Sequence, residues 1–274
     1  MDLLKQEAIA CVGLIPAAGQ ARRVSPLPCS KEIFPVGFGE IRQKGPRHPK
    51  VAAHYLLEKM QRAGAQKTYI VLSKGKWDIP AYFGSGSMVN MAIAYLMTDL
   101  PHGVPFTLDS AFTFLQNKRV LFGFPDIIVH PDDVYIQLLD RLAASQADVV
   151  LGLFPAVNPQ KMDMVELAAD GTIAGIRIKP VQTDLKWTWI IAAWNFSFTR
   201  FMHQYVQDHL AAIAADAGGS EQKDRREVQI GGVIQAAIDS ELEIDSVLFH
   251  RGTYIDIGTP EDMVTAVQTH AFRD

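Results

Sequence analysis

Two arginines and a lysine follow the first apolar segment of the chain, in the stretch CVGLIPAAGQARRVSPLPCSKEIFPVGFGE at residues 11–40. Small residues separate the apolar segment from Arg22, Arg23 and Lys31. Small side chains let backbone N–H groups approach an anion closely, and cationic side chains add charge. The stretch contains neither G-x-x-x-x-G-K-[ST] nor a G-x-G-x-x-G opening a helix. It therefore predicts a phosphate site of another kind.

Charge is distributed unevenly along the chain, whose formal net charge is −4. Between Ala18 and Lys50 there are seven basic residues and two acidic ones. A nucleic-acid-binding domain is usually basic overall. The local positive charge in an acidic protein therefore indicates a small anionic ligand and argues against nucleic acid as a partner.

Strand and helix patterns alternate through the first 155 residues. Strands are predicted at 10–17, 67–73, 90–97, 119–124 and 147–154, and the clearest helices at 49–63 and 131–145. This alternation predicts an α/β fold with a Rossmann-like, mostly parallel mixed sheet and helices on both faces. We expect Pro131 to occupy the first position of the second helix.

The pattern changes after residue 155, where consecutive strands predict a small antiparallel portion. The elements expected there are strands at 163–168, 173–178 and 188–196, a helix at 199–215, a linker at 217–227, a helix at 228–239, strands within 242–255, and a helix from Pro260. A length of 274 residues is compatible with a single domain.

Composition limits the class of protein. Hydrophobic residues make up 48% and charged residues 20%, as in a globular chain with a large core. The first ten residues contain no long apolar run, and no segment reaches the roughly 18 apolar residues that a membrane helix needs. Cys11 and Cys29 have neither a metal-binding nor a redox spacing. We expect a cytoplasmic protein without a signal peptide, membrane contact or disulfide.

Four segments together resemble the sugar-1-phosphate nucleotidyltransferases, a family that includes the glucose-1-phosphate thymidylyl- and uridylyltransferases. The loop IPAAGQARRVSP at 15–26, followed by KEIFP at 31–35, is similar to the family's opening motif. The segments VLFGFPDII at 120–128, GTIAGIRIKP at 171–180 and YIDIGTPEDM at 254–263 are similar to its strands ending in G-D and E-K-P and to its D-x-G-T-P-E. Their order and spacing match over most of the chain.

The resemblance implies a role for each matching charged residue. Arg23 would bind the β- and γ-phosphates of a nucleoside triphosphate, Lys31 the region of its α-phosphate, and Lys179 the sugar-1-phosphate. Asp126 and Asp256 would hold Mg²⁺ between the two phosphates. The sugar-1-phosphate would attack the α-phosphorus in line, and pyrophosphate would leave.

The same resemblance implies further contacts with each substrate. The single domain 1–274 would comprise a nucleotide-binding part, 1–155, and a sugar-phosphate-binding part, 156–274. Ala193 matches a position that lies against the sugar. The residues expected to contact the nucleotide are Ala17, Ala18, Gly19, Gln20, Ala21 and Thr107. Glucose-1-phosphate with dTTP or UTP is the expected substrate pair, and a homo-oligomer is compatible with the family.

Several residues depart from the family's pattern. Ala21 stands where the family has its second loop glycine, and Arg22 where it has threonine. Pro125 replaces the glycine before the metal-binding aspartate, and Ile178 replaces a glutamate that reads sugar hydroxyls. The insertion-like segment 37–50 lengthens the following loop. The sugar and the base therefore remain open.

Structural interpretations compete with the functional ones. The two loop cations are also compatible with a solvated basic loop, and the two aspartates with caps, although 259–262 already supplies a complete helix start. Trp187 and Trp189, at even spacing, favour a packed sheet face over a sugar pocket. The run HPDD at 130–133 favours helix initiation over a metal site.

Two further functions compete with sugar nucleotidyl transfer. Ile178 and the tryptophans suggest a nucleotidyltransferase with a non-sugar acceptor, such as phosphocholine or a cyclitol phosphate. Ala21, Arg22 and Pro125 suggest a nucleotide-sensing or scaffold protein that has kept the fold and lost turnover.

Overall fold

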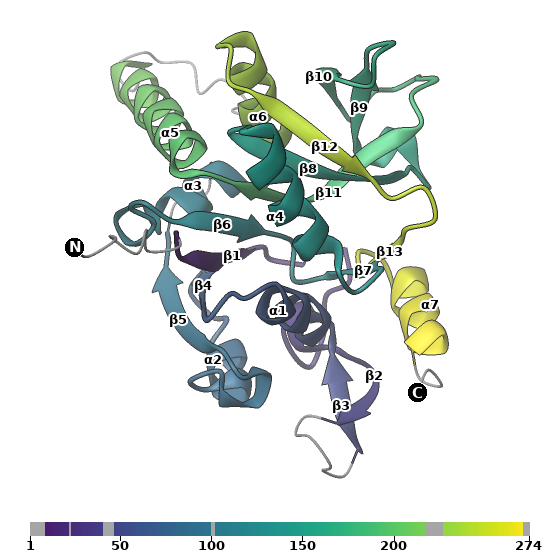
Figure 1. Ribbon diagram of the computed structural model, residues 1–274. Helices are drawn as coiled ribbons and strands as arrows, with labels where there is room; N and C mark the ends of the chain where they lie inside the picture. The colour runs from purple at the N-terminus through teal and green to yellow at the C-terminus, as the bar shows by residue number, and fades with distance from the viewer. Residues whose placement is uncertain (1–8, 22, 41–46, 100–101, 217–226, 271–274) are drawn as a thin grey trace, which may run out of the picture.

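The computed structural model describes residues 9–21, 23–40, 47–99, 102–216 and 227–270 (Figure 1). Its strands are β1 (Cys11–Ala17), β2 (Pro35–Glu40), β3 (Arg47–Val51), β4 (Lys67–Leu72), β5 (Ala92–Met97), β6 (Arg119–Phe122), β7 (Ile127–His130), β8 (Val149–Pro155), β9 (Asp163–Leu167), β10 (Ile173–Ile178), β11 (Trp187–Trp194), β12 (Ile244–Leu248) and β13 (Thr253–Asp256). Its α-helices are α1 (Ala52–Arg62), α2 (Asp78–Phe83), α3 (Val104–Asp109), α4 (Val134–Ser145), α5 (Phe196–Asp216), α6 (Ile230–Asp239) and α7 (Pro260–His270).

A nine-stranded mixed sheet forms the centre of the molecule. Its main path runs β10-β9-β11-β6-β1-β4-β5, and β8 pairs with both β11 and β12. The pairs β1–β4, β1–β6, β4–β5 and β8–β12 are parallel, whereas β11 runs antiparallel to β6, β8 and β9. The expected α/β fold, with parallel core strands and an antiparallel portion, is confirmed.

Helices cover both faces of the sheet, which explains why its strands are continuous apolar runs. Within β1, Ile15 packs with α1 and α4 on one face, and Leu14 packs with α5 and α6 on the other. Both side chains are fully buried. The alternating direction of side chains along a strand thus supplies two separate cores from one segment.

Two short antiparallel sheets stand outside the main one. The pair β2–β3 projects from the body as a hairpin at the bottom of Figure 1, and β7 pairs with β13, which comes from the end of the chain.

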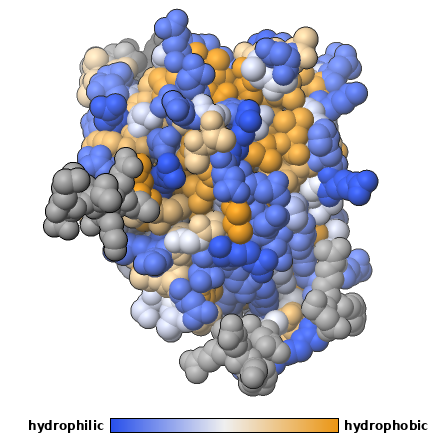
Figure 2. Space-filling view, in the orientation of Figure 1, coloured by the Kyte–Doolittle hydropathy of each residue, from blue (hydrophilic) through white to orange (hydrophobic). Residues whose placement is uncertain are grey.

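The face of the molecule seen in Figure 1 is mainly hydrophilic over its lower part and more apolar above, as Figure 2 shows. Within the ranges given above, no helix is long and apolar enough to cross a membrane.

Two expectations about local structure need correction. The second predicted helix begins at Val134 instead of Pro131, because residues 127–130 form β7. The first predicted helix begins at Ala52, because residues 47–51 form β3. Strand β7 pairs with β13, within the strands predicted at 242–255, whereas β3 pairs with β2, which was not predicted as a strand. Most of the linker predicted at 217–227 lies outside the described residues.

Candidate active site

The residues that follow β1 line a cavity of about 430 Å³, which we call the loop cavity. Its wall includes Pro16 and Ala18 to Ala21 from the loop, Lys31, Thr107 of α3, and Asp126. Small loop residues and a lysine therefore line the same space. Small residues let backbone N–H groups approach a phosphate chain, and a lysine adds positive charge.

A second cavity, of about 240 Å³, lies beside it, and we call it the strand cavity. Strands β9, β11 and β13 contribute to its wall. The charged residues that line it are Arg23, Asp126, Lys161, Asp163, Lys179 and Asp256. Val104, Phe124 and Asp126 line both cavities. The two cavities therefore meet at Asp126.

The β7–β13 sheet brings Asp256 to Asp126. Asp256 is the last residue of β13 and pairs with Ile127, the residue after Asp126. The backbone N–H of Ile257 also donates to the carbonyl oxygen of Asp126, at 2.9 Å. Two carboxylates that are far apart in sequence are thus fixed at one point by backbone hydrogen bonds.

Electrostatics around this carboxylate pair favour a bound cation. Burial and the negative charge of Asp126 raise the pKa of Asp256 to about 6, although Lys31 and Arg23 act in the opposite direction. Lys31 Nζ donates to Asp126 Oδ2. Burial alone would lower the pKa of Lys31, but the carboxylates of Asp126, Glu32 and Asp256 raise it. Lys31 thus partly neutralises a site that carries two adjacent negative charges.

The carboxylate pair suits Mg²⁺ better than a metal that takes three or more of its ligands from protein side chains. Among the described residues, no group of three or more His, Cys, Asp or Glu side chains is placed to hold a metal. Mg²⁺ is usually held by one or two carboxylates, with water and substrate phosphates completing the octahedron. Asp126 and Asp256, on the wall where the two cavities meet, match that requirement.

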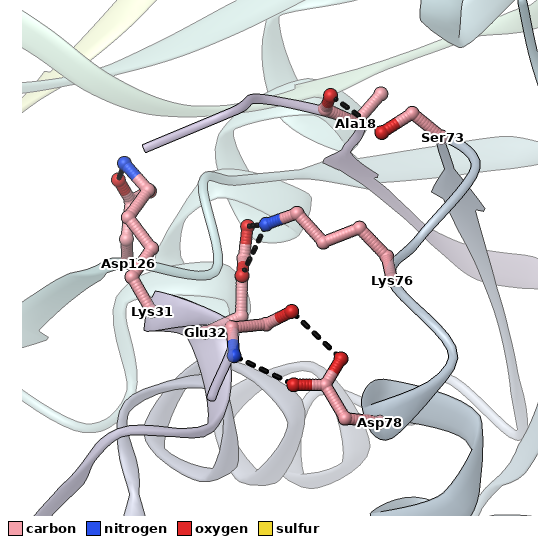
Figure 3. A network of polar contacts seen from close by, with 8 residues as sticks. Ala18, Lys31, Glu32, Ser73, Lys76, Asp78 and Asp126 are labelled. Atoms are coloured by element: carbon pink, nitrogen blue, oxygen red, sulfur yellow. Dashed lines mark hydrogen bonds and ion pairs between the residues drawn. The ribbon is translucent and has the colours of Figure 1, made fainter. Parts of the chain in front are cut away.

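A network of buried polar contacts holds the loop in place (Figure 3). Lys76 Nζ donates to both carboxylate oxygens of Glu32, at 2.8 Å each, and both side chains are buried. The backbone N–H and the hydroxyl of Ser30 donate to Asp78, at 2.6 and 2.7 Å. Ser73 Oγ donates to the carbonyl oxygen of Ala18, at 2.9 Å. The segment after β4 therefore anchors both ends of the phosphate loop.

Lys179 is held differently, at the end of β10. Its φ of 40° lies in the left-handed region, which is uncommon for a residue other than glycine. Its Nζ donates to Gln229 Oε1, at 3.1 Å, and its backbone N–H donates to the carbonyl oxygen of Met162. No ion pair joins it to any residue that the structure describes. Its charge is therefore available to an anion in the strand cavity.

Some of the expected contact residues lie elsewhere. Ala193 is fully buried in the core and lines neither cavity. The residues of β11 that reach the strand cavity are Thr188, Trp189 and Ile190. Ala17 is also buried, behind the loop. Arg23 lines the strand cavity instead of the loop cavity, and Arg22 lies outside the described residues.

The sequence pointed to neither Gln229 nor Asp163, although both line the strand cavity. Neither belongs to a local pattern, because Gln229 precedes α6 and Asp163 opens an ordinary strand. Ala21 has a φ of 49°. This left-handed conformation favours glycine, and here an alanine adopts it.

The chain is similar to known nucleotidyltransferases over almost its whole length. The family model for nucleotidyl transferase matches residues 12–271, and no curated protein matches the sequence. A structure assigned as a glucose-1-phosphate thymidylyltransferase from Bacillus anthracis, with sucrose, has a TM-score of 0.76 at 17% identity and covers 97% of each chain. A UDP-glucose pyrophosphorylase with UDP-glucose has a TM-score of 0.72 at 16% identity, covering 95% of this chain and 98% of that one. A UTP-bound UGPase from Acinetobacter baumannii has a TM-score of 0.69 at 13% identity, covering 95% of this chain and 93% of that one. Because the family model matches residues 12–271, nearly the whole chain, the chain belongs to the nucleotidyl transferase family.

Proposed function

We propose that the protein transfers a nucleotidyl group from a nucleoside triphosphate to a sugar-1-phosphate, forming a nucleoside-diphosphate sugar and pyrophosphate. The observation that carries the proposal is the meeting of the two cavities at Asp126, with Asp256 beside it. One cavity has the amide-rich loop and Lys31, and the other has Lys179. Two phosphates placed in them would face each other across the carboxylate pair.

The residues on each side support an in-line displacement at phosphorus. The loop amides and Lys31 hold the triphosphate, and Lys179 holds the acceptor phosphate. An oxygen of the acceptor phosphate forms a bond to the α-phosphorus while the bond to the bridging oxygen of pyrophosphate breaks. A phosphate oxygen is already anionic near neutral pH, so no general base is needed and catalysis depends on positioning and charge.

Asp126 and Asp256 would hold Mg²⁺ at this point. When bound, the metal neutralises negative charge on the two phosphates and on the leaving oxygen. Lys31 is hydrogen-bonded to Asp126 in the free protein. We infer that Lys31 would contact the α-phosphate once metal and nucleotide are bound. The metal would then replace the lysine ammonium as the cation beside Asp126.

Pyrophosphate release tests the proposal. The protein is incubated with Mg²⁺, each of the common nucleoside triphosphates, and a panel of sugar-1-phosphates. We expect release with glucose-1-phosphate and dTTP or UTP, by analogy with the thymidylyltransferase and the UDP-glucose pyrophosphorylase that have similar structures. A protein that binds nucleotide in calorimetry but releases no pyrophosphate with any acceptor would be a nucleotide-binding protein without turnover.

A second candidate is transfer to a non-sugar phosphate. Ile178 is 39% exposed beside Lys179, and the aromatic rings of Phe124 and Trp189 line the strand cavity. An apolar wall of this kind suits an acceptor with apolar groups, such as the methyl groups of choline phosphate. Choline phosphate is therefore included in the panel together with a cyclitol phosphate, which is a non-sugar acceptor that carries hydroxyl groups, and a strong preference for hexose-1-phosphates rejects this candidate.

A further inference from the structure

Asp163, the first residue of β9, has a carboxylate oxygen that forms no hydrogen bond with any residue that the structure describes. The residue lines the strand cavity, and its Oδ1 is covered from solvent without a hydrogen bond. Burial raises the pKa of this carboxyl, and the positive charge of Lys179 opposes the rise. Covering a carboxylate without a hydrogen-bond donor costs free energy. A bound molecule that supplies a donor would remove that cost.

A complementary group lies opposite Asp163 on β11. The antiparallel register pairs Thr188 with Met164, so the next positions, Trp189 and Asp163, face each other across the two strands. Thr188 Oγ1 donates to the carbonyl oxygen of Asp163, at 2.9 Å, which fixes the strands at this point. Trp189 Nε1 is also covered from solvent and without a partner. Two residues of the cavity wall, on neighbouring strands, thus each have a covered polar atom that no described residue bonds: an acceptor on Asp163 and a donor on Trp189.

The chemistry of this pair matches a hydroxyl group. A hydroxyl donates one hydrogen bond and accepts others, whereas an indole N–H only donates and a carboxylate only accepts. A single hydroxyl therefore satisfies both groups at once. Rotation about the last bond of the Asp163 side chain presents either of its oxygens to an occupant of the cavity. An apolar acceptor would leave both groups without partners.

The position of Lys179 orients the occupant. Lys179 and Asp163 both line the strand cavity, and the positive charge of Lys179 acts on the Asp163 carboxyl. We propose that Asp163, with Trp189, is a specificity-determining residue that accepts a hydrogen bond from a hydroxyl of the acceptor's carbon skeleton. The inference rests on the proposed function, because it places the acceptor phosphate at Lys179. The ligand class is a phosphorylated polyol, either a sugar or a cyclitol.

The experiment compares wild type with Asp163→Ala and with the control Glu166→Gln. Glu166 lies on the same strand, does not line the cavity, and forms an exposed ion pair with Arg177. Pyrophosphate release is measured with a saturating nucleotide and varied glucose-1-phosphate, its four monodeoxy analogues, inositol-1-phosphate and choline phosphate. We expect Asp163→Ala to raise the acceptor KM by roughly tenfold to a hundredfold, the scale of one hydrogen bond to a charged group. The control should match wild type.

The deoxy analogues separate hydroxyl recognition from general disturbance. One analogue should be poorer than glucose-1-phosphate by a similar factor in wild type and equally good in Asp163→Ala. Trp189→Phe should show a smaller loss with the same analogue pattern. Nucleotide affinity by calorimetry should be unchanged, and the melting temperature of Asp163→Ala should be unchanged or higher, because a carboxylate without a donor is removed.

Three results overturn the inference. In the first, Asp163→Ala matches wild type with every acceptor. In the second, every deoxy analogue loses the same factor in wild type and variant. In the third, choline phosphate is the acceptor that depends on Asp163, so the carboxylate binds a cation. If wild type releases no pyrophosphate at all, the proposed function fails instead, and calorimetric titration of glucose-1-phosphate into wild type and Asp163→Ala still tests the contact.

Discussion

Lys31 in the loop cavity is paired with the carboxylate of Asp126, whereas the side chain of Lys179 in the strand cavity donates to the amide oxygen of Gln229 and forms no ion pair with a described residue. The same contrast extends to the acids. Glu32 behind the loop is held by Lys76 through two hydrogen bonds, whereas Asp163 has an oxygen without a partner. The loop side balances its charges within the protein, and the strand side leaves them for a ligand.

This difference suggests how each side contributes to binding. A loop held by its own ion pairs loses little conformational freedom when a triphosphate arrives, which favours affinity. Polar groups left without partners favour specificity instead, because only an occupant with matching groups satisfies them. We therefore expect the loop side to accept nucleotides through their common phosphates, and the strand side to discriminate among acceptors.

The largest effect is expected where the two sides meet. Asp126→Asn and Asp256→Asn should each lower turnover by roughly a hundredfold or more, because charge stabilisation at a phosphoryl centre is lost. The matched control is Asp262→Asn, since Asp262 contacts Thr259 at the start of α7 and does not line either cavity. Steady-state rates and melting temperatures are measured together. A variant with a lower melting temperature and full activity would show that its aspartate caps a turn or helix and does not take part in turnover.

The same substitution in the two regions should affect stability very differently. Lys76→Met leaves the Glu32 carboxylate buried alone and should lower the free energy of unfolding by about 3 kcal/mol. Adding Glu32→Leu should recover much of that loss. Lys179→Met should change stability by no more than about 0.5 kcal/mol, because Lys179 is exposed and its hydrogen bond to Gln229 lies at the surface. Urea denaturation measures the free energy of unfolding of both variants. Equal losses would show that the two lysines do not differ in their contribution to stability.

Kinetic constants should distinguish the roles of Lys31 and Lys179. Lys179→Met should raise the acceptor KM about tenfold to a hundredfold with an unchanged nucleotide dissociation constant. Lys31→Met should weaken nucleotide binding and lower kcat. Initial-rate kinetics and calorimetry with Mg²⁺ give both constants. If Lys179→Met weakens nucleotide binding as strongly as Lys31→Met does, the two cavities do not hold different substrates.

A smaller effect concerns pH and stability without metal. The Asp256 carboxyl has a pKa of about 6 in the folded protein and titrates near its ordinary 3.8 when unfolded. Between these values the folded state binds more protons, so stability from this group is greatest in acid and is lost as pH rises through about 6. Asp256→Asn should therefore be more stable than wild type at pH 7, by on the order of 1 kcal/mol after solvent screening, and the difference should shrink towards pH 4. Denaturation series at both pH values with a chelator measure it, and a constant difference would contradict the assignment.

The smallest effect is expected at Ala21. Its positive φ strains an alanine by about 1 kcal/mol, but glycine gives the unfolded chain more freedom, so the two contributions nearly cancel. Ala21→Gly should change the free energy of unfolding by less than about 1 kcal/mol and leave pyrophosphate release intact. Ala21→Val should lower both the free energy of unfolding and the rate of pyrophosphate release, because a β-branched side chain tolerates this conformation poorly. A large gain in nucleotide affinity for the glycine variant would show that the alanine restricts the loop.

Local patterns were sufficient for the strands of the main sheet, and four charged residues that the family resemblance singled out lie together in the structure, while their roles stay predictions. Strands such as β1 and β4 are buried on both faces, so their apolar runs stand out in the sequence. Lys31, Asp126, Lys179 and Asp256 lie at the ends of strands or in the loop after β1, and the structure gathers them at the walls of two adjoining cavities.

Features that depend on distant pairing were missed. Nothing near β7 signals that it pairs with β13, so its residues were taken for the approach to a helix. Ala193 was expected to contact a sugar, but β11 has neighbours on both sides there, which buries the residue completely. Asp163 and Gln229 enter the strand cavity through the packing of β9, β11 and α6, which no short segment of sequence encodes.

The pairing of β7 with β13 also determines when during synthesis the protein can become active. The ladder that fixes Asp256 beside Asp126 uses residues 253–256, almost at the end of the described chain. A nascent chain that ends before β13 already contains the phosphate loop, Lys31, Asp126 and Lys179, but it has only one of the two carboxylates. A ribosome-bound intermediate is thus expected to bind nucleotide weakly without consuming it.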